Sequence, residues 1–301
     1  MALILALGVS TTHADFIPAN AAGFAVLFEG GGNNHLSFNN GTIMGGIGIG
    51  APSGTTTAQL QLSGGAANSI INGNVQFAGA ANVAGTAGTD YSITAGHTIT
   101  GNNPSVQAIL NSYNSLSSTL GGEAGSALAV SIGNGGNQTV NASSGTLDAN
   151  GNRVFTVNTF SFVNGASLTI NGSASEFLVF NFSSSVAFGG AIHLTGGLTS
   201  DNVLFNITGG SGLTGGNTLT LNNNGAILTG TFLDPNGSIQ MNHTVLDGRL
   251  IGGDSHDEMI VSGASIFVPA PEPGSLAIIG LGLFGLAALR LRAKPLKSGN
   301  Q

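Results

Sequence analysis

The side chains best suited to chemistry lie together in one short segment, Asp254-Ser255-His256-Asp257-Glu258, directly after two glycines. Carboxylate oxygens are preferred ligands of Ca²⁺, so Asp254, Asp257 and Glu258 form a candidate calcium site. Their spacing matches neither the EF-hand loop nor the glycine- and aspartate-rich nonapeptide repeat. The alternative interpretation is a solvated polar loop in front of a strand at 259–261.

A second arrangement of carboxylates would support hydrolysis. β-Helical proteins can bring acids from distant rungs onto one face, and Asp201, Asp234 and Asp247 are the candidate set for such a site. Acids placed in this way can act as general acid and base, so this alternative is a secreted, carboxylate-dependent, polysaccharide-active enzyme. Other signals of catalysis are missing, because the sequence has no Gly-x-Ser-x-Gly elbow, no cysteine and only scattered histidines. We therefore expect a protein that is not an enzyme and has no cofactor besides the candidate calcium.

Two Thr-x-Thr steps, Thr98-Ile99-Thr100 and Thr218-Leu219-Thr220, have the pattern found on ice-binding β-faces. A flat ice-binding face needs a stacked array of such steps, and these two copies are far apart in the chain. Ice binding is therefore a further alternative function, and it depends on whether the fold brings the two steps together.

The segment Gly46-Ile47-Gly48-Ile49-Gly50 has a superficial likeness to a dinucleotide-binding loop. The third glycine is misplaced, Pro52 follows, and no helical pattern begins there. We expect a glycine-rich turn of a β-structure instead.

Positive charge is almost confined to the C-terminus. The chain has 301 residues, 6 % of them charged, and only six are Lys or Arg. Two of these, Arg153 and Arg249, lie in the body of the chain, and the other four form a basic tail, namely Arg290, Arg292, Lys294 and Lys297. Nucleic-acid binding requires a basic surface, so the composition excludes that class of partner.

An apolar run at 276–289 precedes this basic tail. Its roughly 14 residues would span about 21 Å as a helix, somewhat short of the ~30 Å hydrocarbon core of a bilayer. The cationic tail nevertheless favours a membrane helix at 276–289 with its C-terminus in the cytoplasm and the body outside. A Pro-Glu-Pro motif, Pro271-Glu272-Pro273, stands just before the run.

These three parts, in this order at the end of the chain, resemble the PEP-CTERM sorting signal of Gram-negative bacteria. The resemblance implies recognition by an exosortase during export, with cleavage of the signal and delivery of the body to the cell surface or beyond. An ordinary tail anchor is the alternative. At the other end, 1–14 is expected to be a secretory signal peptide, because an apolar run leads to a small-residue cleavage site. Its basic n-region is missing, so we expect the signal to be truncated at its start, and a buried N-terminal segment is the alternative. The expected organisation is thus a signal peptide at 1–14, a body at 15–267, a proline-rich neck at 268–274 and the sorting segment at 275–297.

The body reads as an all-β stack. Short runs of alternating apolar and polar residues recur between glycines and asparagines, as in strands with one buried face. The runs at 177–182 and 203–207 are continuous rather than alternating and are richer in aromatic residues, as in strands buried on both faces. Their shared patterns, Phe180-Asn181-Phe182 and Phe205-Asn206-Ile207, predict stacked rungs about 25 residues apart. We expect a β-solenoid-like fold, with a β-sandwich as the alternative.

One segment has helical rather than β periodicity. Apolar residues at i, i+3, i+4, i+7, i+10 and i+14 from Val106 predict an amphipathic helix over 104–120. Asn103 is suited to its N-cap, Pro104 to its first position and Gly121 to its end. The apolar face of this helix must pack along the flank of the β-stack.

The order of an early strand-rich part, one helix, and then Arg153–Val157, 177–182, 201–206, 225–236 and 245–253 resembles the choice-of-anchor A domain of bacterial surface proteins. It is also similar to the ice-binding-like β-solenoid adhesin domain, in which one long helix packs along the solenoid. Both resemblances imply an exported surface or extracellular-matrix protein with a structural or adhesive role. The low charge and the many Asn, Ser and Thr side chains fit contact with an extracellular polysaccharide.

Overall fold

The structure is a computed structural model, and it describes residues 16–18, 20–30, 34–50, 59–208, 218–253 and 258–268. All of them belong to one compact unit that ends at Val268, and 269–301 form a second unit. We call the first unit the body. The expected signal peptide, Pro-Glu-Pro motif, membrane segment and basic tail lie outside the described residues. Within the described residues, no helix is long and apolar enough to cross a membrane.

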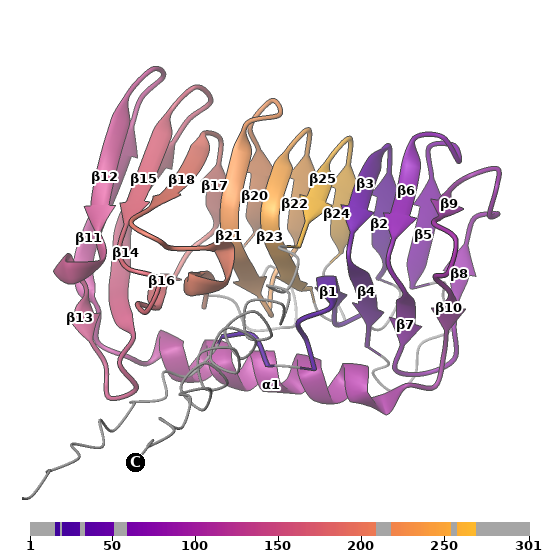
Figure 1. Ribbon diagram of the computed structural model, residues 1–301. Helices are drawn as coiled ribbons and strands as arrows, with labels where there is room; N and C mark the ends of the chain where they lie inside the picture. The colour runs from indigo at the N-terminus through magenta and orange to yellow at the C-terminus, as the bar shows by residue number, and fades with distance from the viewer. Residues whose placement is uncertain are drawn as a thin grey trace, which may run out of the picture. The chain divides into compact units, whose positions relative to one another are not determined.

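The body is a β-solenoid with three faces, and nearly all neighbouring strands are parallel, which rules out the sandwich alternative (Figure 1). The helix-side face lies against the helix. In spatial order it contains β10 (Ile99–Thr100), β7 (Val75–Phe77), β4 (Gly46–Ile49), β1 (Phe24–Phe28), β23 (Val245–Gly252), β21 (Ile227–Asp234), β19 (Val203–Ile207), β16 (Leu178–Phe182), β14 (Arg153–Phe162) and β11 (Ser126–Ile132).

The other two faces complete each coil. The second face runs in the order β17 (Val186–Phe188), β20 (Leu219–Asn222), β22 (Ile239–Asn242), β24 (Met259–Ser262), β2 (Leu36–Asn39), β5 (Leu60–Ser63) and β8 (Val83–Ala84). The third face contains β12 (Asn137–Asn141), β15 (Ser167–Asn171), β18 (Ala191–Thr195), the first halves of β21 and β23, β25 (Ser265–Phe267), β3 (Gly41–Met44), β6 (Ser69–Asn72) and β9 (Ser92–Ile93). Short elements at corners are β13 (Thr146–Leu147), which is antiparallel to β14, and the 3₁₀ turns Ala142–Ser144 and Ser200–Asn202.

The coils do not stack in chain order. The chain enters at β1 in the middle of the stack, proceeds to one end at β10, and crosses to the other end through α1 (Pro104–Gly121). From β11 the chain returns coil by coil toward the middle of the stack and reaches β23, which pairs with β1. Figure 1 shows this seam, where the yellow C-terminal strands lie beside the indigo N-terminal ones.

The stacked rungs confirm the spacing predicted from the two Phe-Asn patterns. Phe180 is paired with Phe205, and Asn181 with Asn206. The rings of Phe155 and Phe232 extend this column to four stacked phenylalanines, with centroid separations of 4.9, 5.3 and 4.7 Å. Stacked aromatic rings on successive rungs fill the solenoid interior and fix the register between coils.

The helix also forms where the sequence predicts it. The Asn103 side chain accepts a hydrogen bond from the backbone N–H of Ser105, Pro104 occupies the first turn, and the helix ends at Gly121. Its buried side chains are Val106, Ile109, Leu110, Tyr113, Ser117 and Leu120. They pack on apolar residues of the helix-side face such as Leu27, Leu204 and Ile251. This contact explains why several strands of that face are buried on both sides.

Polar contacts fasten the C-terminal half of the helix to the sheet. Asn206 donates from Nδ2 to the Ser117 carbonyl (3.1 Å) and accepts from the Ser117 hydroxyl (2.6 Å). It also donates to Oδ1 of Asn181 (2.8 Å), whose own Nδ2 donates to the Leu120 carbonyl (2.7 Å). Because these groups are buried, each depends on the others for its hydrogen bonds.

The glycine-rich segment 46–50 is a strand, not the turn expected from the sequence. In β4, Ile47 and Ile49 are in the solenoid core, and the alternate glycines lie under the helix. A Cβ built on Gly48 would lie 2.5 Å from Leu27 Cδ2 and 3.2 Å from Val106 Cγ1. Gly48 therefore leaves room for the Leu27 and Val106 side chains between sheet and helix, a use of glycine that local sequence cannot distinguish from a turn.

Replacing Asn206 by Ala should leave the Ser117 hydroxyl and the Asn181 carbonyl oxygen buried without their partner. We expect the free energy of unfolding to fall by about 1–3 kcal/mol, measured by urea denaturation. Asn171→Ala is the matched control, because Asn171 makes a similar side-chain contact with Asn141 (3.1 Å) in an exposed position. The control should change stability by less than about 0.5 kcal/mol. Equal losses in the two variants would contradict a special role for the buried ladder.

Candidate functional site

The candidate calcium ligands are only partly described. Asp254 and Asp257 lie outside the described residues, and Glu258 lies beside His35, with Oε1 3.6 Å from Nδ1. In the described part of the chain no group of three His, Asp or Glu side chains is arranged to hold a metal ion. The calcium site remains a prediction.

The structure brings together two of the three acids proposed for hydrolysis. Asp201, in the 3₁₀ turn before β19, forms an ion pair with Arg249, and Asp247 is close enough to Asp201 to feel its charge. Asp234 lies at the far end of β21, five residues along from Thr229, the residue paired with Asp247. At about 3.3 Å per residue that separation is roughly 16 Å. The three carboxylates therefore do not form one site.

Asp201 has a structural partner, the buried Arg249. The Arg249 side chain is only 2 % exposed, and besides Asp201 it donates to the Ala22 carbonyl (3.1 Å), so it ties the seam to the N-terminal segment. Burial raises the pKa of Asp247 above its usual value, and the Asp201 charge raises it further. A buried guanidinium needs its carboxylate partner, which gives Asp201 a sufficient role without catalysis.

The two Thr-x-Thr steps lie on different faces. Thr220 is in β20 of the second face, and Thr100 is in β10 at the end of the helix-side face. They therefore do not belong to one flat array.

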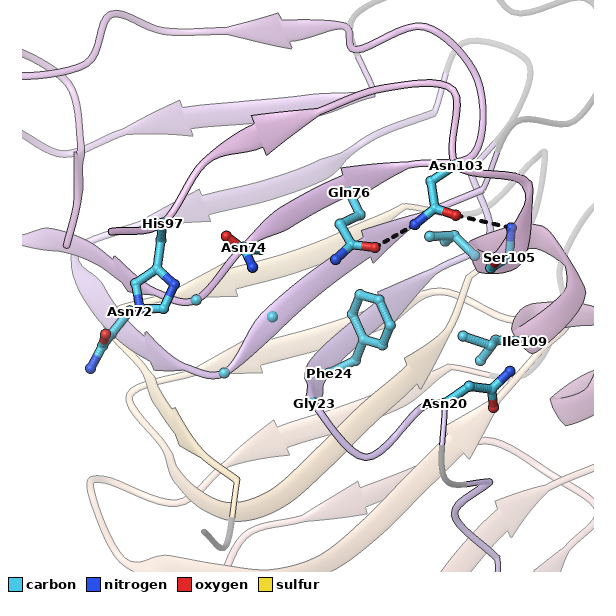
Figure 2. Close-up of a pocket in the computed structure, with 14 residues that line it drawn as sticks. Asn20, Gly23, Phe24, Asn72, Asn74, Gln76, His97, Asn103, Ser105 and Ile109 are labelled. Carbon is cyan, nitrogen blue, oxygen red and sulfur yellow. Dashed lines mark hydrogen bonds between the residues drawn. The ribbon is translucent and has the colours of Figure 1, made fainter. Parts of the chain in front are cut away.

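A cavity that the sequence does not indicate lies beside the N-terminal end of α1. It has a volume of about 420 Å³ and is bounded by the helix, the turn before β1, and the corners where β3, β6 and β9 lead into the helix-side face. Five side-chain amides and one imidazole line it, as Figure 2 shows: Asn20, Asn72, Asn74, Gln76, Asn103 and His97. We call it the amide cavity.

Part of the amide lining is fixed by internal hydrogen bonds. Asn103, the helix cap, donates from Nδ2 to Oε1 of Gln76 (2.6 Å), which leaves the Gln76 amide nitrogen available (Figure 2). The side-chain oxygen of Asn74 accepts from the Thr98 backbone N–H (3.0 Å), so its amide nitrogen is also available. Among the described residues, the side chains of Asn20, Asn72 and His97 make no hydrogen bond.

The remaining walls are apolar or backbone. The Phe24 ring, Val106 and Ile109 supply apolar surface. Glycines form the corner, where a Cβ on Gly73 would lie 2.0 Å from the Gly45 carbonyl oxygen. No carboxylate, lysine or arginine is among the described residues that line the cavity. The site can offer neutral hydrogen bonds and one apolar wall, but no charge and no metal ligands beyond a single imidazole.

Several solved structures share the fold of the body. The chain is similar to an ice-binding protein from the Antarctic ascomycete Antarctomyces psychrotrophicus, with 17 % identity and a TM-score of 0.51 over 86 % of this chain and all of that one. An ice-binding protein from an Antarctic biological consortium has 16 % identity and a TM-score of 0.54, over 85 % of this chain and 92 % of that one. One from an Arctic yeast has 18 % identity and a TM-score of 0.52, over 86 % of this chain and 98 % of that one. At these identities the likeness establishes the fold. No curated protein sequence matches the chain significantly.

Residues 21–261 match the family described as an ice-binding-like adhesive domain, and the chain belongs to that family. Residues 269–293 match the PEP-CTERM protein-sorting motif, which confirms the interpretation of the C-terminal residues as a sorting signal.

Asp201 and Asp247 should affect stability in opposite directions. The raised pKa means that folded Asp247 holds its proton more tightly than the unfolded chain does, so stability is lost as pH rises through and above its usual pKa. Asp247→Asn should therefore stabilise the protein at pH 7, by less than about 1 kcal/mol because water reaches the carboxylate, and the gain should vanish below about pH 4.

Asp201→Asn should instead destabilise at pH 7, by about 1–3 kcal/mol, because Arg249 loses its partner while Asp201 itself is 41 % exposed. Urea denaturation at pH 3.5 and pH 7 measures both effects. Destabilisation by Asp247→Asn at neutral pH would show that this carboxylate has a favourable partner we have not identified.

Proposed function

We propose that the protein is exported and serves in the extracellular layer as an adhesive or structural component that contacts polysaccharide. The observation that carries this proposal is the order of its two matched parts. An ice-binding-like adhesive domain fills 21–261, and a protein-sorting motif follows at once, at 269–293. Neither matched family model describes an enzyme. Asp201, one of the acids considered for hydrolysis, forms an ion pair with the buried Arg249.

The surface of the body supports contact with a neutral polymer. Its two arginines, Arg153 and Arg249, are paired with Glu176 and Asp201. Outward-facing positions carry polar but uncharged side chains in register, as in the row Asn222, Asn242, Ser262, Asn39 and Ser63 along the second face. Amides and hydroxyls both donate and accept hydrogen bonds, as sugar hydroxyls do.

The proposal includes the sorting route. An exosortase is the expected partner, acting at Pro271, Glu272 and Pro273. The segment 276–289 would be held in the membrane while the basic tail, Arg290, Arg292, Lys294 and Lys297, stays in the cytoplasm. Cleavage would then release the body to the cell surface or the medium.

Ice binding is the second candidate, because the solved structures that share the fold are ice-binding proteins. The surface chemistry favours it less. Along the second face, the outward side chains in register are Ala187, Thr220, Gln240, Ile260, Ser37, Gln61 and Ala84, a mixed row with two long, flexible amides. Ice lattices are matched by regular rows of short side chains, so this row fits a polymer contact better.

Sorting can be tested by fractionating producing cells and determining the mature C-terminus by mass spectrometry. We expect the body outside the inner membrane with its C-terminus before the apolar run. Replacement of Pro271, Glu272 and Pro273 by alanines should leave full-length protein in the membrane fraction. A parent protein that keeps its basic tail after export would contradict processing and leave the tail-anchor interpretation.

The adhesive role predicts that exported protein sediments with the extracellular polymer of its producing cells and is released by excess soluble polymer. Weak sites repeated along a polymer give retention through effective concentration, so release should need a high concentration of a short fragment. Ice growth in the same preparation is the discriminating control. Failure to sediment together with faceted ice crystals would replace the adhesive proposal by ice binding.

A further inference from the structure

We propose that the amide cavity binds one neutral sugar unit of a polysaccharide, through its hydroxyls and its apolar ring face. This inference rests on the proposed function and gives it a site. The cavity of about 420 Å³ lies in the range usual for small-molecule sites, which combine apolar walls with a few oriented polar groups.

The polar side of the cavity matches a ring of hydroxyls. Each free amide offers two donors and an acceptor, and each sugar hydroxyl can both donate and accept. Gln76 and Asn74 keep their amide nitrogens free while their oxygens are held by Asn103 and the Thr98 backbone, so these donors are oriented before a ligand arrives. Asn72 and Asn20 add side chains that make no other hydrogen bond among the described residues. Groups held in place in advance cost less conformational entropy on binding.

The apolar side of the cavity matches the C–H face of a pyranose. The Phe24 ring lies at one wall with Ile109 of the helix near it (Figure 2). Val106 of the helix also lines the cavity. These three side chains are already fixed by packing between helix and sheet. Val106 is fully buried, and Ile109 and Phe24 are only 3 % and 7 % exposed. A ligand would therefore meet mainly the small exposed part of the Phe24 ring, and the polar groups must provide most of the binding.

The charge of the site selects against anionic ligands. A helix N-terminus attracts anions through its free N–H groups, but here the Asn103 side chain occupies the Ser105 N–H and the Asn103 carbonyl accepts from the Val106 N–H. Both arginines of the body are used elsewhere, and the chain carries a net charge of −7. Among the described lining residues, His97 is the one side chain able to carry a positive charge for a uronate or a phosphate.

Gly23 offers a way to close the cavity without disturbing the fold. It is exposed, it lines the cavity, and a Cβ built on it meets no atom within 4 Å. A leucine there would occupy space that the ligand needs. Gly133 is the matched control, because it also is exposed, has room for a Cβ and lies in the corner between β11 and β12, away from the cavity.

The test is saturation-transfer NMR on the full-length protein with methyl glycosides of glucose, mannose and galactose, and with glucuronate and inorganic phosphate as charged probes. We expect transfer to at least one neutral glycoside. Gly23→Leu should weaken it about tenfold or more, and Asn72→Leu should weaken it about tenfold through lost hydrogen bonds. Gly133→Leu and Asn137→Leu, an exposed asparagine at the start of β12 away from the cavity, should bind as the parent does.

Three results would overturn the inference: no transfer to any neutral glycoside, equal binding by parent and cavity variants, or displacement of the glycoside by phosphate or glucuronate. Sedimentation with extracellular polymer separates this inference from the proposed function. If Gly23→Leu sediments as well as the parent, the adhesive role stands and the cavity is not its site. If the parent binds glycosides in the cavity but does not sediment, the cavity stands and the adhesive role fails.

Discussion

The packing of α1 against the helix-side face is the contact on which the body depends. The chain starts in the middle of the stack, so it must cross from one end to the other without breaking the rungs, and the helix provides that crossing. Its length fits the task. Eighteen residues span about 27 Å, and the six inter-strand steps from β7, beside its first turn, to β16, beside its last, span about 29 Å. The sheet places leucines and isoleucines under the apolar stripe of the helix, glycines Gly48 and Gly50 where β4 passes beneath it, and Asn181 and Asn206 at the far end.

The seam between β1 and β23 follows from the same crossing and decides where the chain leaves the body. The last strand, β25, pairs with β23 on one side and β3 on the other, and the Val268 N–H donates to the Met44 carbonyl. All rungs are thus complete by Val268, one residue before the matched sorting motif begins. The last described strand thus ends close to the point where the sorting motif begins.

Local patterns predicted those parts of the fold that depend on neighbours in sequence. The helix at 104–120 was found from its periodicity and its cap, and the pairing of Phe180 with Phe205 from a repeated tripeptide. The crossing of the helix and the order of the coils could not be predicted, because no strict repeat tells which coil follows which. The same lack of a repeat hid the strand character of 46–50 and the buried place of Ser117, a polar residue whose partner Asn206 is 89 positions away. Of the three acids, only Asp201 and Asp247 meet, because β21 bends from one face to another and carries Asp234 away.

The amide cavity shows why this part of the function escapes sequence patterns. Many of its residues come from three successive corners and from the turn before β1, and corners in a solenoid are chosen for backbone conformation first. An asparagine at 72 or 74 therefore looks the same in sequence as the many asparagines that only turn the chain. What distinguishes them is that α1 begins beside this column and leaves space between its first turn and the sheet. In this fold the inward-facing residues of the three faces hold the stack together. Substitutions at the corners beside the helix can therefore change the cavity without altering those residues. Shared folds at identities below 20 % are therefore a poor guide to the ligand, and the chemistry of the corners is a better one.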